Sequence, residues 1–110
     1  MESIEQRRHP RVNVDFFADW GWGPDCEYYD RVTSLSLSGC FIVTRRELSS
    51  GQEIYLKWTA ERVGMISLKG SVRYLLRVME GAAPTGAGIE FVNMSGDVRK
   101  KLEILVSELA

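Results

Sequence analysis

The longest alternating stretch of this chain, between Ile66 and Leu76, favours a fold built from strands. Apolar side chains recur there at every second position, which is the pattern of a strand with one buried face. We assign its inner face to Ile66, Leu68, Gly70, Val72, Tyr74 and Leu76. A glycine in the middle of a strand indicates a bend, because it lets a sheet curl tightly. Gly70 therefore predicts a curved sheet of the kind that closes into a barrel.

Shorter stretches on both sides of this strand complete the prediction of a barrel. Strands are expected at residues 12–16, about 27–35, 40–44, 53–59 and around 89–91, and residues 79–88, rich in glycine, are expected to form a loop. The alternation is cleanest in residues 53–59, where Ile54, Leu56 and Trp58 share one face. With the longest strand these stretches predict a small six-stranded β-barrel, chiefly antiparallel.

The sequence Trp20-Gly-Trp-Gly-Pro24 interrupts the first predicted strand. Alternating glycines that end in a proline favour a turn, and a turn has little room to bury two indole rings. We therefore expect the first strand to end before Trp20. One of Trp20 and Trp22 should cap the barrel, and the other should be exposed.

Residues 95–109 are predicted to form a C-terminal helix. Ser95 is a good N-cap residue, and Asp97 falls in the first turn, where the helix dipole favours a carboxylate. Apolar residues then recur at helical spacing, at Val98, Leu102, Leu105 and Leu109. We expect this apolar stripe to pack on the barrel, and a dimer interface is the alternative.

Composition argues against several classes of function. A formal net charge of −1 disfavours binding to a nucleic-acid polymer, which requires a basic surface. Cys26 and Cys40 are isolated and His9 is the single histidine, so neither a zinc site nor a cysteine nucleophile is expected. No apolar run reaches the length of a membrane span, and residues 1–5 lack the order of a signal peptide. We therefore expect a cytoplasmic protein with no membrane insertion, metal, cofactor or catalytic site.

Three serines and a glycine separate two of the predicted strands, in the sequence Ser34-Leu-Ser-Leu-Ser-Gly39. On an extended chain the three hydroxyls would face one side, toward water or a ligand, and the two leucines between them would face the core. Gly39 permits either a positive φ or the close approach of another group. A simple hairpin turn rich in serine and glycine is the alternative interpretation.

A cluster of arginines precedes the first predicted strand, in the sequence Arg7-Arg-His-Pro-Arg11. Pro10 disfavours a helix and stiffens the chain around it. We expect residues 1–11 to form a polar arm outside a barrel domain of residues 12–110, and to stay flexible until a ligand orders them. The cluster is either an anion-binding site or a solvated arm.

Together these two stretches resemble the motifs of the PilZ domain, a small bacterial β-barrel that binds the second messenger cyclic di-GMP. That family carries R-x-x-x-R, followed by [D/N]-x-S-x-x-G. Arg7 and Arg11 match the first motif, and Ser36 and Gly39 match the second, but Ser34 stands where the family has Asp or Asn. The resemblance covers nearly the whole chain and implies the barrel and terminal helix predicted above.

The resemblance also implies a site for cyclic di-GMP, made by Arg7, Arg8, Arg11, Ser34, Ser36 and Gly39. It implies a receptor or adaptor that signals to an unidentified protein partner when the nucleotide orders the arm. The alternative is a PilZ-like interaction module that no longer binds the nucleotide, as the change at Ser34 would allow. A third hypothesis, stacking of single-stranded nucleic acid on Trp58 and Tyr55, is disfavoured by the acidic net charge.

Overall fold

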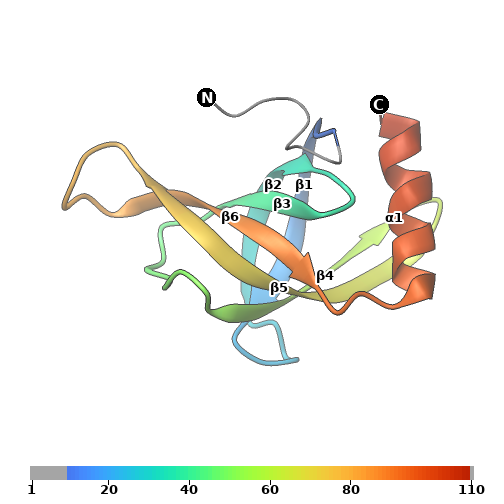
Figure 1. The fold of residues 1–110 in the computed structure, drawn as a ribbon, viewed down its shortest axis with the longest axis horizontal. Coiled ribbons are helices and arrows are strands. Elements are labelled where there is room, and N and C mark those ends of the chain that lie inside the picture. Colours follow the sequence, from blue (N-terminus) through green and yellow to red (C-terminus); the bar gives the residue numbers. More distant parts are fainter. Residues whose placement is uncertain (1–9, 110) are drawn as a thin grey trace.

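The computed structural model describes residues 10–109 and has the form of a closed antiparallel β-barrel with one C-terminal helix (Figure 1). The elements are β1 (Val12–Gly21), β2 (Tyr28–Leu35), β3 (Gly39–Val43), β4 (Glu53–Ala60), β5 (Gly64–Arg77), β6 (Pro84–Val92) and α1 (Gly96–Leu109). Around the barrel the strand order is β1-β2-β3-β6-β5-β4, and β4 pairs with β1 to close it. The predicted fold class is therefore confirmed.

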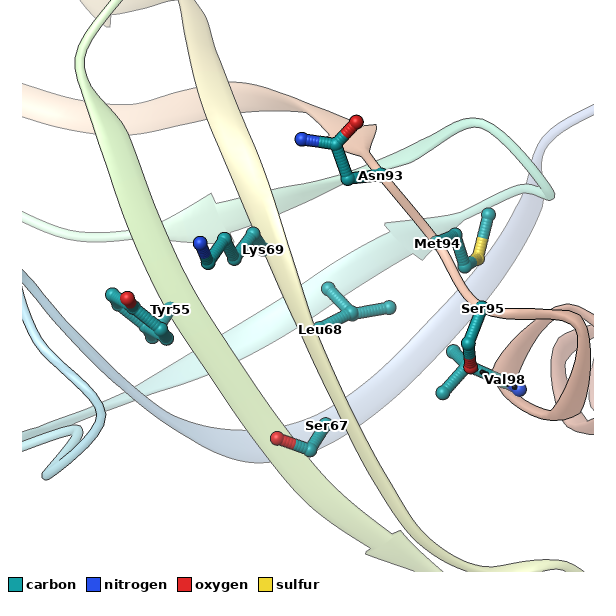
Figure 2. Close-up of a pocket in the computed structure, with 8 residues that line it drawn as sticks. All are labelled: Tyr55, Ser67, Leu68, Lys69, Asn93, Met94, Ser95 and Val98. Atoms are coloured by element: carbon teal, nitrogen blue, oxygen red, sulfur yellow. Dashed lines mark hydrogen bonds between the residues drawn. The ribbon is translucent and has the colours of Figure 1, made fainter.

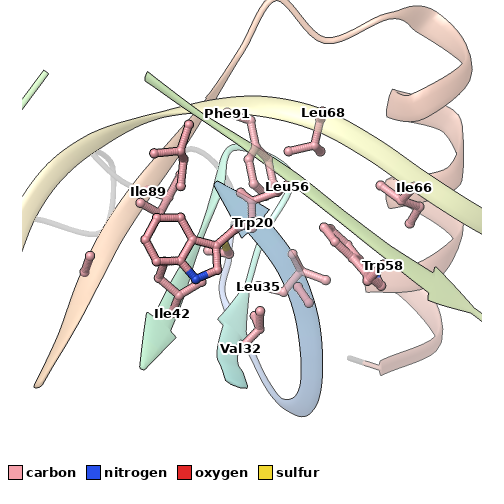
Figure 3. Close-up of a cluster of buried hydrophobic side chains, with 14 of the residues drawn as sticks. Trp20, Val32, Leu35, Ile42, Leu56, Trp58, Ile66, Leu68, Ile89 and Phe91 are labelled. Carbon is pink, nitrogen blue, oxygen red and sulfur yellow. The ribbon is translucent and has the colours of Figure 1, made fainter. Parts of the chain in front are cut away.

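The interior of the barrel is filled by apolar side chains from neighbouring strands (Figure 3). Ile54, Leu56 and Trp58 of β4 are buried, as their alternation predicted. The Phe16 ring packs against Trp58 with 5.1 Å between the ring centroids. Burial of a large apolar side chain contributes about 1.5–3 kcal/mol. This core is therefore the main favourable contribution to folding.

Trp20 lies in this core and not in a turn. The prediction that the first strand ends before Trp20 is wrong, because β1 continues to Gly21. The indole is fully buried, and its Nε1 donates a hydrogen bond of 2.8 Å to the Asp30 carboxylate. That bond satisfies the polar atom that burial would otherwise leave without a partner. Trp22 is 39% exposed, as expected for one of the two tryptophans, whereas Trp20 is part of the core.

A bulge in β5 reverses the face assignment near the end of this strand. The register with β6 shifts between Val72 and Tyr74, and a shift of one residue turns the following side chains to the other face. Tyr74 and Leu76 were predicted to face inward, but they are 47% and 51% exposed. Leu75 packs against the core in their place. The predicted inner face is thus right up to Val72 and wrong beyond it.

The second half of the predicted loop at 79–88 is a strand, because β6 begins at Pro84. Its glycines make room for aromatic rings. A Cβ on Gly86 would lie 2.3 Å from the Phe41 ring, and one on Gly88 would lie 2.2 Å from the Tyr74 ring. These glycines therefore reflect close packing on the sheet, and not a turn.

β5 and β6 extend beyond the rest of the barrel as a long hairpin (Figure 1). Arg77 holds the hairpin against the loop between β3 and β4. Its guanidinium donates two hydrogen bonds to the Glu47 carboxylate, at 2.6 and 2.8 Å, and a third to the Ala82 carbonyl at 2.6 Å. Paired bonds of this kind fix geometry as well as adding energy.

The helix α1 begins as the sequence predicted. The backbone N–H of Val98 donates to the Ser95 hydroxyl at 3.2 Å, so Ser95 is the N-cap. Leu102 is buried, Val98 and Leu105 pack against the core, and Leu109 remains 45% exposed. The apolar stripe thus covers the barrel except at its last position.

Within residues 10–109, no helix combines the length and the apolar character needed to span a membrane.

Candidate functional site

Ser36 organises the serine loop, residues 34–39, where the chain turns from β2 into β3. Its hydroxyl is buried and accepts hydrogen bonds from the backbone N–H groups of Ser38, at 3.1 Å, and Gly39, at 3.2 Å. Its own N–H donates to the Gly39 carbonyl at 2.9 Å, which closes the turn. The expected row of outward hydroxyls is therefore wrong at Ser36, because buried backbone donors in the turn require an acceptor.

Gly39 is required by the close approach of β6. A Cβ at this position would lie 2.2 Å from the carbonyl oxygen of Ile89 and 3.4 Å from the Cα of Glu90. Gly39 does not adopt a positive φ. Of the two explanations offered by the sequence, the close approach of another backbone is the correct one.

Arg11, the last residue of the arginine cluster, contacts this loop. Its Nη1 donates to the Ser34 hydroxyl at 3.4 Å, across 23 positions of sequence. The antiparallel pairing of β1 with β2 sets Val12 opposite Leu35, which places Arg11 beside the loop. Arg11 is exposed and Ser34 is half-buried, so both are accessible from solvent. Arg7 and Arg8 lie outside the described residues.

A charged pair borders the loop on the β6 side. Glu90 is the register partner of Gly39, and the Arg73 guanidinium donates to the Glu90 carboxylate at 2.7 Å. Glu90 is exposed on β6. Its place beside the serine loop depends on the pairing of β3 with β6, and no local sequence signal announces that pairing.

Cys40, which follows the loop, is not poised for chemistry. Burial raises the pKa of its thiol to about 12, against the opposing effect of the Arg11 charge. The thiol therefore stays protonated at neutral pH, whereas the nucleophilic form of cysteine is the thiolate.

Across residues 10–109, no three His, Cys, Asp or Glu side chains gather into a group that could hold a metal ion.

A shallow cleft of about 310 Å³ lies elsewhere on the barrel, between the outer face of β4 and β5 and the start of α1 (Figure 2). It is lined by Tyr55, Ser67, Leu68, Lys69, Asn93, Met94, Ser95 and Val98. Lys69 extends toward Tyr55, with Nζ 5.3 Å from the ring centroid. None of the lining residues belongs to either motif, so the cleft is not the candidate site.

The position of Trp58 argues against the hypothesis that single-stranded nucleic acid stacks on this residue. Trp58 is only 5% exposed and packs on Phe16 inside the barrel. A base needs access to the face of an aromatic ring in order to stack on it. Trp58 cannot provide that face.

Comparison with known proteins identifies one family. A model of the PilZ domain matches residues 5–108, and no curated protein was found to match the sequence. Among solved structures, the PilZ domain with c-di-GMP of YcgR from Escherichia coli has a TM-score of 0.71 at 18% identity, covering 94% of this chain and 91% of that one.

Two longer proteins have a similar fold. The inhibitor of motility MotI/DgrA from Bacillus subtilis has a TM-score of 0.76 at 17% identity, covering 98% of this chain and 52% of that one. The MrkH–c-di-GMP complex from K. pneumonia has a TM-score of 0.73 at 19% identity, with 94% and 52% covered. This chain thus spans about half the length of these two proteins.

Proposed function

This chain belongs to the PilZ domain family, and on that premise we propose that it is a receptor and adaptor domain for cyclic di-GMP. The observation that carries the proposal is the surface contact between Arg11 of the first motif and Ser34 of the second. The YcgR domain and MrkH, two of the structural neighbours, are complexes with cyclic di-GMP. They support the class of ligand, and the contact supports its location.

Arginine suits both parts of this ligand. A planar guanidinium can donate two hydrogen bonds to a phosphate or to the O6/N7 edge of guanine, and its face can stack on the base. Arg7, Arg8 and Arg11 would supply these contacts from the arm. Arg11 already lies beside the serine loop. Each hydrogen bond to a charged group would contribute about 1.5–3 kcal/mol.

The serine loop would hold the other side of the nucleotide. Ser34 and the backbone around Gly39 would make the direct contacts. Ser36 would contribute indirectly. Its hydroxyl accepts hydrogen bonds from the N–H groups of Ser38 and Gly39 and so fixes the shape of the loop. We therefore assign Ser36 a positioning role in the site.

The signal would pass to the protein partner through the arm itself. A nucleotide held between residues 1–11 and the loop would order the arm against the barrel, and a protein partner would recognise the combined surface. The domain would act by binding and not by catalysis, without a metal or a cofactor, in the bacterial cytoplasm.

The second candidate is an interaction module that does not bind the nucleotide. Ser34 is the observation that favours it. Asp or Asn at this position presents an acceptor to the guanine N–H groups from a longer side chain, whereas serine is short and uncharged. Loss of one charge-assisted hydrogen bond would weaken binding by about 1.5–3 kcal/mol.

Isothermal titration calorimetry with cyclic di-GMP, and with GTP as the control ligand, tests the proposal. The wild-type protein should bind cyclic di-GMP only. Arg7→Ala and Arg11→Ala should each abolish binding and leave the thermal melt unchanged. Arg99→Ala is the matched control, because Arg99 pairs with Glu103 on the surface of α1. Unchanged affinity in both arm variants would contradict the assigned site, and no binding by the wild type would favour the interaction module.

A further inference from the structure

Two aromatic side chains lie exposed on the outer face of the β1–β2 hairpin. Phe17 is 47% exposed and Tyr29 is 65% exposed. Their rings are stacked, with centroids 5.0 Å apart and an interplanar angle of 18°. Aromatic residues are enriched in protein interfaces, where their large faces become buried. Neither residue belongs to the two motifs, so this pair lies outside the candidate nucleotide site.

Tyr29 is the most exposed aromatic residue of the described chain, and no cation lies over its ring. The pairs within the described chain are Arg31 over Phe17 at 5.7 Å, Arg46 over Tyr28 at 3.6 Å and Lys69 over Tyr55 at 5.3 Å. Phe17 covers one face of the Tyr29 ring, and the exposure of Tyr29 leaves the other face open. Within residues 10–109, no Lys or Arg lies over that open face.

Carboxylates lie around Tyr29. Asp19 is its register partner on β1, and the exposed residues Asp25 and Glu27 come shortly before it in the chain. Between described residues, none of these three carboxylates forms an ion pair. Lys57, the register partner of Asp19 on β4, offsets one of the three charges. Arg31, over the adjacent Phe17 ring, pairs with Asp15 at 3.2 Å, so these two charges cancel. The open aromatic face is therefore set in a net negative surface.

We propose that this surface, formed by Phe17, Asp19, Glu27 and Tyr29, binds an arginine-bearing segment of a partner protein. A guanidinium can stack on an aromatic ring and pair with a carboxylate at the same time, so it matches both features of the surface. An acidic segment would be repelled by the carboxylates, and an apolar one would leave them unpaired. The inference specifies which kind of partner the adaptor binds, and in that respect it rests on the proposed function. The contact itself requires no nucleotide.

An NMR titration of the isotope-labelled full chain, without nucleotide, tests this proposal. The probe is a short synthetic peptide in which arginine alternates with serine, and the control peptide carries citrulline, an uncharged analogue of similar shape, in place of arginine. The arginine peptide should shift the amide signals of Asp19, Glu27 and Tyr29, and the citrulline peptide should not. Added salt should weaken the response, because the charges are exposed.

Variants with matched controls separate the contact from general charge attraction. Tyr29→Ser should weaken binding of the arginine peptide by about two- to fivefold, as the loss of an exposed cation–π contact predicts. Tyr55→Ser is its control, because the Tyr55 ring already holds Lys69. Glu27→Gln should also weaken binding, whereas Glu61→Gln, in the exposed turn after β4, should not.

The proposal would be overturned by equal shifts with the citrulline peptide, by shifts confined to another part of the barrel, or by unchanged binding in Tyr29→Ser. Broadening of the same signals by self-association, without peptide, would assign the surface to a second copy and overturn it too. A protein that binds the arginine peptide here but gives no calorimetric response to cyclic di-GMP would uphold this surface and refute the receptor role. The reverse result would refute the surface alone.

Discussion

Replacement of Gly39 by alanine should destabilise the barrel at the point where the serine loop is attached. The new methyl group would lie 2.2 Å from the carbonyl oxygen of Ile89 and 3.3 Å from its carbonyl carbon. The obstacle is backbone, which cannot rotate away as a flexible side chain can. β3 and β6 would therefore have to separate by roughly an ångström, in an interior packed with few voids.

The cost of this separation can be worked out from two contributions. Overpacking a tight site typically costs about 1–3 kcal/mol. The adjacent hydrogen bond from the Phe91 N–H to the Ser38 carbonyl, 2.8 Å long, would be stretched as well. A net loss of about 0.5–1.5 kcal/mol is usual for one such bond. We expect the free energy of unfolding to fall by about 2–4 kcal/mol, and the melting temperature to fall by about 10 °C or more.

Urea denaturation, followed by tryptophan fluorescence to which the buried Trp20 and Trp58 contribute, measures this change. The midpoint should fall with little change in slope, since the area exposed on unfolding is nearly the same. Gly23→Ala is the matched control, because nothing lies within 4 Å of its Cβ position and its φ is not positive. A Gly39→Ala protein as stable as Gly23→Ala would refute the reasoning.

Three further predictions concern single side chains. Asp30→Ala should cost about 1–3 kcal/mol in urea denaturation, because it leaves the buried Trp20 indole N–H without its acceptor, and Asp30→Asn should recover most of this loss. Burial raises the pKa of Cys40 from 9.0 to about 12, so the unfolded chain loses this proton first as the pH rises. The free energy of unfolding should therefore decline between about pH 9 and pH 12, and denaturation at a series of pH values should show a smaller decline for Cys40→Ala. Ser34→Asp should tighten cyclic di-GMP binding by up to about 1.5–3 kcal/mol in calorimetry, and Ser34→Ala should weaken it. If Ser34→Ala binds as well as the wild type, the hydroxyl is not a ligand contact.

The fold could be predicted from the sequence because its strands and helix carry strong local patterns. The alternation of β4 and the helical stripe of α1 each follow from one buried face. The errors occurred where a long-range contact overrides a local pattern. The bulge in β5 changes which face Tyr74 occupies, and Gly86 and Gly88 resemble turn residues until the Phe41 and Tyr74 rings are seen above them.

The candidate site was less predictable than the fold. The motifs name Arg11, Ser34, Ser36 and Gly39, but the chain alone does not say which hydroxyl points inward. Ser36 is buried because the turn leaves backbone donors that need an acceptor, and this requirement depends on how the loop closes. The position of Glu90 beside Gly39 depends on strand pairing across half the chain, which no short motif encodes.

The central claim is that cyclic di-GMP binds where Arg11 meets the serine loop. The most direct test is an NMR titration of the labelled wild-type chain with cyclic di-GMP, with every backbone amide followed. The largest shifts should occur at Arg7, Arg8 and Arg11 and from Ser34 to Gly39. An absence of shifts at saturating nucleotide, or shifts centred on the cleft around Tyr55 and Lys69, would contradict it.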